Sequence, residues 1–305
     1  MYQGMSDRFY GSTEPVPSRL HRRSVQLAEM FAVGFSLILA KMGILNVAHG
    51  TFATWGALSS YWLVAEHGLS FWAALVIGVA FAGALGVAAD VVAFEPLRKR
   101  NAGTFAPIIA SIGIWIVLLT LAEGFAGPTA TSYPTESVPS EPIRFAGLLL
   151  LPAQVISVLA LVLIVTAVHF LLTRSRFGAA VRAVSVDSRS ATIVGVNARQ
   201  VLITVAFLAA AIAGLAGVLA ALSDNNVSFG IGEALLLKGF AAVVVGGYGD
   251  IRGAALLGVG IGVLEVMSAQ YISSGFRDAI TFGVLLVVLV FRPQGIFGER
   301  QLVRA

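Results

Sequence analysis

The sequence predicts an all-α fold: a polytopic bundle with about eight or nine membrane segments, some of them short or broken. Composition is the first reason. Hydrophobic residues make up 57% of the 305 residues and charged residues only 12%, whereas soluble domains average about 25% charged residues. The second reason is that the mean hydropathy of +0.88 is concentrated in long apolar runs. The chain has no cysteine, which excludes disulfides and thiolate metal sites.

The apolar runs set the predicted elements, because a bilayer core takes about 20 residues per helix. Several runs are shorter than this, which indicates broken or tilted helices packed inside protein. A polar tail is expected at 1–24, a transmembrane domain at 25–298 and a short tail at 299–305. The predicted spans are Val25–Gly43, Thr51–Val64, Phe71–Phe94, Phe105–Phe125, Leu148–Thr173, Leu202–Leu222, Ala234–Gly247, Ala254–Tyr271 and Ala279–Phe291.

Basic residues predict the orientation of the spans. The chain carries 20 lysines and arginines against 16 acids, a net charge of +4, and they lie in short loops rather than in a block that would bind nucleic acid. Basic loops stay in the cytoplasm, which places residues 98–100, 174–201 and the C-terminal tail inside. The expected outer loops are Glu66–Leu69, Pro128–Gly147, Ser223–Gly232 and Ser273–Phe276.

The N-terminal tail has two possible positions. If Val25–Gly43 and Thr51–Val64 both cross the membrane, the tail lies outside; if they form one broken unit around Asn46–Gly50, it lies inside. The positive-inside rule favours the second arrangement, and the length of the runs favours the first. We expect two separate helices and an external tail.

The segment 174–201 is basic, with five arginines and one acid, Asp187. Its interior nevertheless has helical character. Residues 179–186 predict one short helix, and residues 188–194 predict a second that ends at Gly195, because glycine accepts the left-handed backbone conformation at a helix end. A structured cytoplasmic element on a membrane protein indicates a docking partner.

Polar residues interrupt the apolar pattern at Asn46, His49 and Gly50. At membrane depth such groups must be satisfied inside the protein. Two interpretations are compatible: the break lines a substrate path, or Asn46 and His49 cap the broken helix ends and bond a neighbouring helix.

A second polar group lies in the last third of the chain. Glu265 falls inside an apolar run, where a carboxylate is costly and indicates function. It is expected to pair with Lys238, to line the path, or to make a buried structural hydrogen bond. Gly246 and Gly247 permit a turn or a broken helix nearby. None of the three lysines lies in a P-loop motif, so ATP hydrolysis is not expected of this chain.

Four scattered histidines give no metal-ligand spacing, and no nucleophile–base pair is evident, so neither a metal site nor a catalytic set is predicted. Asp90 lies near the end of a span and is expected at the membrane interface.

Several motifs together resemble the ABC-transporter permeases of the branched-chain amino acid (LivH-like) family. The resemblance extends over about residues 27–298, and the run around Asp187 resembles the coupling loop of these permeases. The general loop begins Glu-Ala-Ala, whereas here Asp187 supplies the acid. The other motifs are Asn46-Val47-Ala48-His49-Gly50, Glu95-Pro96-Leu97-Arg98, Lys238-Gly239-Phe240 with the glycines after it, and Arg292-Pro293-Gln294-Gly295.

The resemblance implies an inner-membrane, multi-pass permease subunit of an ATP-driven importer that works by alternating access. It implies two ABC ATPase subunits that bind the ATP, a second related permease subunit or a second copy of this chain, a periplasmic substrate-binding protein and contact with membrane lipid. The implied substrates are branched-chain amino acids, other amino acids, amides or urea. The expected ATPase-coupling residues are Arg182, Asp187, Ala191, Gly195 and Val196.

The implied translocation path consists of Asn46, His49, Gly50, Lys238, Gly246, Gly247 and Glu265. The alternative is a secondary transporter or channel that works alone. It would require buried carboxylates for ion coupling, of which only Glu265 is well placed, and it leaves the structured loop unexplained.

Overall fold

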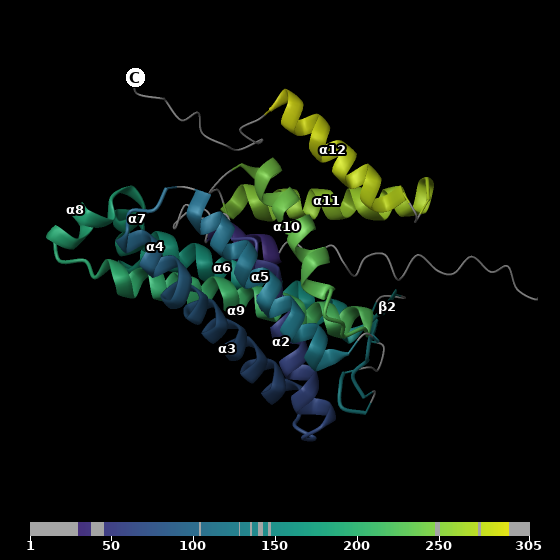
Figure 1. Ribbon diagram of the computed structural model, residues 1–305. Coiled ribbons are helices and arrows are strands. Elements are labelled where there is room, and N and C mark those ends of the chain that lie inside the picture. Colours follow the sequence, from purple (N-terminus) through teal and green to yellow (C-terminus); the bar gives the residue numbers. More distant parts are fainter. Residues whose placement is uncertain are drawn as a thin grey trace, which may run out of the picture.

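The computed structural model describes residues 30–37, 46–103, 105–127, 129–134, 136–139, 143–145, 148–247, 251–273 and 276–292. Both predicted tails lie outside these residues, so the side on which the N-terminal tail lies stays a prediction. Residues 30–37 are helical. The further elements, labelled as in Figure 1, are α2 (His49–Ala65), α3 (Phe71–Ala89), η1 (Asp90–Phe94), α4 (Glu95–Lys99), α5 (Phe105–Ala126), β1 (Ile143–Phe145), β2 (Leu148–Leu150), α6 (Pro152–Arg174), α7 (Arg176–Val186), α8 (Ser188–Ile193), α9 (Ala198–Asp224), α10 (Ile231–Gly246), α11 (Ile251–Tyr271) and α12 (Arg277–Phe291).

The predicted all-helical architecture is confirmed, and each predicted span from Thr51 onward contains a helix. One boundary was wrong. The run Leu148–Thr173 was predicted to be helical throughout, but Leu148–Leu150 pairs with Ile143–Phe145 as a short antiparallel hairpin, and α6 begins only at Pro152. Proline favours the first turn of a helix because its missing N–H is not needed there.

Four helical stretches among the described residues are long and apolar enough to cross a membrane, namely Phe71–Lys99, Phe105–Ala126, Pro152–Arg174 and Ala198–Asp224. The first of these runs through α3, a π-helical turn (η1) and α4 without interruption. The expected short segments are also found, because α2, α10 and α12 contain 17, 16 and 15 residues.

The core forms where α2 and α3 pack against α9, which is the most deeply buried of the four long helices. Small residues make this approach possible. A side chain at Gly217 would lie 2.0 Å from the carbonyl oxygen of Ala53, and one at Gly214 would lie 2.4 Å from the Cβ of Ala82. Ala213 and Gly217, four positions apart on one face of α9, are both buried.

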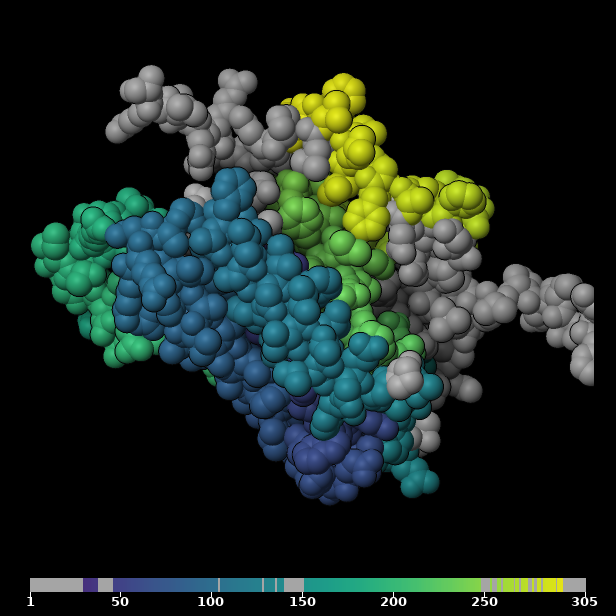
Figure 2. All heavy atoms as spheres, viewed as in Figure 1, coloured from purple at the N-terminus to yellow at the C-terminus, as the bar shows by residue number. Residues whose placement is uncertain are grey.

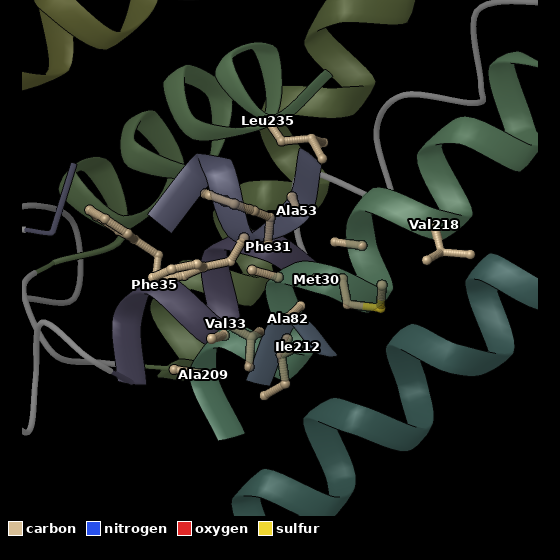
Figure 3. Close-up of a cluster of buried hydrophobic side chains, with 14 of the residues drawn as sticks. Met30, Phe31, Val33, Phe35, Ala53, Ala82, Ala209, Ile212, Val218 and Leu235 are labelled. Carbon is tan, nitrogen blue, oxygen red and sulfur yellow. The ribbon is translucent and has the colours of Figure 1, made fainter. Parts of the chain in front are cut away.

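Residues 30–37 complete this core from a second side. Figure 3 shows Met30, Phe31 and Phe35 beside Ala53 and Leu235, which belong to α2 and α10. Phe31 and Met30 are fully buried. The N-terminal helix therefore packs between elements that are far apart in the sequence.

Two of the predicted outer loops, Pro128–Gly147 and Ser223–Gly232, contact each other. Thr131 and Val227 form an antiparallel bridge with N···O distances of 2.9 and 2.7 Å. Tyr133, whose side chain is 2% exposed, hydrogen-bonds Ser60 of α2 over 2.5 Å. Figure 1 places α4, α7 and α8 at the other end of the molecule from these contacts. The segregation of these loops agrees with the alternation that the basic residues predicted.

Candidate coupling surface and translocation path

The basic segment 174–201 folds as predicted into two short helices with defined ends. The Ser175 hydroxyl accepts a hydrogen bond from the amide of Gly178 and begins α7. The Asp187 carboxylate accepts hydrogen bonds from the amide of Arg189 and the hydroxyl of Ser190 and begins α8. Gly195 follows α8 with φ +91°, the left-handed conformation expected of a glycine stop.

The same hydrogen bonds set the charge of Asp187. The Ser190 hydroxyl first, and the Arg189 amide second, hold the pKa of this carboxyl below its ordinary value. Hydrogen bonds to the ionised form favour that form. Asp187 is therefore an anion at neutral pH and caps α8 in this state.

Three of the predicted coupling residues attach the element to the bundle. Ala191 is 4% exposed, and Val196 packs against the hydrophobic core. The Arg182 guanidinium donates to the carbonyl oxygen of Leu172 at the end of α6. The element is thus fixed at its base rather than being a mobile loop.

The outer surface of the element is apolar to an unusual degree. Val186 is 88%, Ile193 84% and Val194 78% exposed, although they belong to a basic segment. In Figure 2 this segment, in emerald green, projects at the left beyond the rest of the visible surface. From the sequence, these residues were interpreted only as part of short helices. No local pattern shows whether a valine in such a helix is exposed to solvent or packed against the bundle.

Beside α8, polar contacts join the segment 174–201 to the connection between α3 and α5. Arg199 at the start of α9 reaches the Glu95 carboxylate over 2.9 Å, and Lys99 reaches the same oxygen over 2.7 Å. Arg189 of α8 donates to the Asn101 side chain over 3.1 Å. These long-range contacts have no signal in the sequence.

The position of Asp90 corrects a prediction. The sequence placed it at the membrane interface, but its side chain is 1% exposed and accepts two hydrogen bonds of 2.8 Å from Arg98. The π-helical turn Asp90–Phe94 shifts the register between α3 and α4, and a single turn of this kind often marks a functional site.

The polar break at Asn46–Gly50 forms the start of α2. Asn46 is buried, and its side-chain oxygen accepts from the Ala48 amide over 3.0 Å in the turn before α2, whose N-cap is Ala48 and which has no side-chain cap. The predicted capping of α2 by Asn46 is therefore not found. Val47 donates to the Ser111 hydroxyl of α5 over 3.1 Å. Gly50 allows α10 to approach, because a side chain there would lie 2.7 Å from the Gly232 carbonyl oxygen.

His49 is fully buried in an aromatic environment. The ring centroids of Phe31, Phe35 and Phe52 lie 4.8, 5.6 and 6.0 Å from its imidazole. Within the part of the chain that the structure describes, neither ring nitrogen has a hydrogen-bond partner. The expected hydrogen bond from His49 to a neighbouring helix is therefore not found.

Glu265 and Lys238 form the ion pair that was one of the predicted alternatives. Their oxygen and nitrogen lie 2.5 Å apart, and the side chains are 2% and 11% exposed. The pair joins α11 to α10. Gly246 is the last residue of α10, and Gly247 follows with φ +105°, which gives the predicted break in the helix.

Contacts among residues 30–37, α2, α10 and α11 connect Asn46, His49 and Gly50 with Lys238 and Glu265, whereas Gly246 and Gly247 lie at the C-terminal end of α10. Gly239, next to Lys238, would place a side chain 2.4 Å from the ring of Phe31, which itself lies beside His49. Phe35 connects the two groups further, since its ring lies 6.2 Å from that of Phe240. That these residues together form a translocation path stays a prediction.

Long apolar helices, a small-residue core and a capped basic loop define a multi-pass helical membrane protein. Residues 24–289 match the family model described as the permease component of branched-chain amino acid transport systems. This match covers most of the chain, and the chain belongs to that family.

Curated relatives agree with the family. The chain is 29% identical over 282 residues to the high-affinity branched-chain amino acid transport system permease protein BraD of Pseudomonas aeruginosa, covering 88% of this chain and 91% of BraD. It is 29% identical to LivH of Escherichia coli over 287 residues, again 88% and 91% of the two chains. The permease protein LivM of Escherichia coli is 24% identical over 314 residues, covering 92% of this chain and 71% of LivM.

Proposed function

We propose that this chain is the membrane-spanning permease subunit of an ATP-driven importer for branched-chain amino acids or related small amino acids and amides. Solute crosses by alternating access, and separate subunits hydrolyse the ATP. The family and the names of its relatives support the permease role and the substrate class. The proposed location is the cytoplasmic (inner) membrane.

The observation that carries the ATP-driven part of the proposal is the apolar surface of α7 and α8. Val186, Ile193 and Val194 stand out into water on a rigid, capped element whose base is buried. Exposed apolar clusters rimmed by polar residues are typical of protein–protein interfaces. An ATPase subunit that covers this surface would push directly on α6 and α9, to which the element is joined.

The proposed complex contains two ATPase subunits, a second permease subunit and a periplasmic substrate-binding protein. The second permease is a related chain or a second copy of this one. Two different permease proteins of Escherichia coli, LivH and LivM, both resemble this chain, which supports a related chain. The outward faces of α5 and α6, which are largely unburied, would contact lipid or the second permease.

The proposed path lies where residues 30–37 and α2 meet α10 and α11. Asn46, His49 and Gly50 would line it from one side. The Phe31, Phe35 and Phe52 rings around His49 suit an aliphatic side chain. On the other side the path would be lined by Lys238, Gly246, Gly247 and Glu265.

The test is purification of the chain from its native membranes in mild detergent, with co-purifying proteins identified by mass spectrometry. We expect a stoichiometric partner that carries a P-loop. The paired change Ile193→Asp and Val194→Asp should abolish its recovery, because charge on this surface opposes apolar contact.

Gly195 provides a second variant with a matched control. Gly195→Val forces a branched side chain into φ +91°, which strains the end of α8, and ATPase recovery should fall. Gly103 also has open space around it but no positive φ, so Gly103→Val should leave recovery unchanged. Recovery of the chain alone, together with solute movement in liposomes without ATP, would favour the secondary-transporter alternative.

A further inference from the structure

The two cytoplasmic loops are held together by charge rather than by close packing. A pocket of ≈ 420 Å³ separates α4 from α8 and the start of α9. Its lining residues are Glu95, Arg98, Lys99, Ser188, Ala198, Arg199 and Leu202. Across this space the direct links are the Glu95–Arg199 ion pair and the Arg189–Asn101 hydrogen bond.

The two partners of the pair belong to different elements, α4 and α9; further along, α9 also packs against α3. Arg199 lies two positions after Asn197, whose side chain caps α9 directly behind the coupling element. Glu95 begins α4, which continues α3 through the π-helical turn. Motion of α8 that moves the start of α9 would therefore pull on the end of the α3 membrane helix.

The Glu95 end of this link is rigid. The Glu95 side chain is 9% exposed, and the neighbouring Asp90–Arg98 pair ties the π-helical turn to α4 with two hydrogen bonds. The Arg199 end is adaptable, because its side chain is 63% exposed and borders the open pocket. Water can replace the pair at the exposed Arg199 end, and Lys99 still neutralises the Glu95 carboxylate when Arg199 leaves. The pair can therefore form and break during a cycle without unfolding the loops.

We propose that Glu95 is a positioning residue of transport: through Arg199 it carries the ATP-driven movement of the coupling element to the membrane helix α3. This inference rests on the proposed function. It adds a second transmission point that lies outside the α7–α8 segment. Packing alone connects α7 and α8 to α6 and α9, whereas the Glu95–Arg199 pair reaches α3 from its cytoplasmic end.

Lys99 supplies the matched control. It binds the same Glu95 oxygen but lies four residues further along α4, so its pair does not cross the pocket. Lys99→Gln removes one positive charge from the carboxylate and leaves the link between the loops in place. Arg199→Gln removes one positive charge and breaks the link.

The experiment follows ATP-driven movement in the full transporter, purified with its co-purifying subunits. The chain has no cysteine, so Val76→Cys on α3 and Ile116→Cys on α5, both exposed, accept a pair of spin labels. The distance between the labels is measured before and after addition of ATP with vanadate. This readout requires ATP but no transported solute.

In Arg199→Gln and Glu95→Gln we expect ATPase recovery and thermal stability like those of the unmutated chain. The fraction of molecules whose label distance changes on addition of ATP with vanadate should fall about tenfold. A change of this size is within the usual range of coupling between two sites. Lys99→Gln should keep the shift. The charge swap Glu95→Arg with Arg199→Glu, made together with Lys99→Gln so that the new cation meets no like charge, should restore it.

Three results would overturn the inference. If Arg199→Gln keeps the full ATP-driven shift, the pair transmits nothing. If Arg199→Gln loses its ATPase subunits, the arginine belongs to the docking surface instead. If the unmutated chain yields no ATPase partner and no ATP-dependent shift, the proposed importer itself fails, and the inference fails with it.

Discussion

At the scale of single residues, the close contact of α2 and α9 depends on the missing side chain of Gly217. The carbonyl oxygen of Ala53 occupies the place where a Cβ would lie, and backbone cannot move aside as a flexible side chain can. Interior positions of this kind tolerate little extra volume.

We predict that Gly217→Val lowers the free energy of unfolding of the detergent-purified protein by about 1–3 kcal/mol or more, which is the usual cost of overpacking. The melting temperature should fall accordingly. Gly113 is the control. It lies on the exposed face of α5, and a Cβ added there would meet no atom within 4 Å, so Gly113→Ala should be neutral or slightly stabilising. Equal melting temperatures for both variants would contradict the packing argument.

A second prediction at this scale concerns the buried Lys238–Glu265 pair. Removing one member of a buried ion pair leaves an uncompensated charge and costs about 3–5 kcal/mol, whereas replacing both by apolar residues is often neutral. Glu265→Gln should therefore destabilise the protein strongly, and Lys238→Met with Glu265→Leu should not, as measured by thermal unfolding.

The same double variant separates a structural from a transport role. If the pair lines the path, the stable double variant should still lose ATP-driven uptake of radiolabelled leucine in proteoliposomes. Normal uptake by that variant would leave the pair with a purely structural role between α10 and α11.

At the scale of elements, the capping of α8 by Asp187 predicts a pH dependence. A carboxyl whose pKa is lower in the folded chain than in the unfolded chain stabilises the fold above its unfolded pKa, and this contribution is lost as the pH falls through the folded value. The ordinary aspartate pKa is about 3.9. Hydrogen exchange of peptides covering α8, corrected for intrinsic rates, should be constant from about pH 8 to 5 and rise only below about pH 4.

Variants test whether Asp187 causes this behaviour. Asp187→Ala should show fast exchange already at neutral pH, because the cap is lost. Asp187→Asn should keep the cap, since asparagine is an equally good N-terminal capping residue, and should lose the acid response. A rise in exchange between pH 7 and 6 in the unmutated chain would point to a different titrating group.

The elements themselves were largely predictable, because composition, apolar runs and helix-end signals act locally. Gly195, for example, was predicted to end a helix, and α8 ends at Ile193, two positions before it. The hairpin at Leu148–Leu150 was missed, since three leucines next to a helix carry no strand signal of their own. The Glu95–Arg199 pair and the burial of Asp90 were missed for a different reason: both arise from tertiary packing that no local pattern encodes.

At the scale of the whole molecule, the two ends of the bundle should face opposite sides of the membrane. Single cysteines test this directly because the natural chain has none. Ala130 lies in the outer connector and Ser185 in the coupling element, and both are exposed. A membrane-impermeant maleimide should label Ala130→Cys in intact spheroplasts and Ser185→Cys only after permeabilisation. Labelling of both from one side would refute the topology.

The bridge between Thr131 and Val227 also constrains the order in which the chain can fold during its synthesis. The two residues are 96 positions apart, so a growing chain completes α6 to α9 before the second half of the bridge emerges. Before Val227 has been made, Thr131 lacks its bridge partner, so the contact between these two connections forms only after α9 is complete.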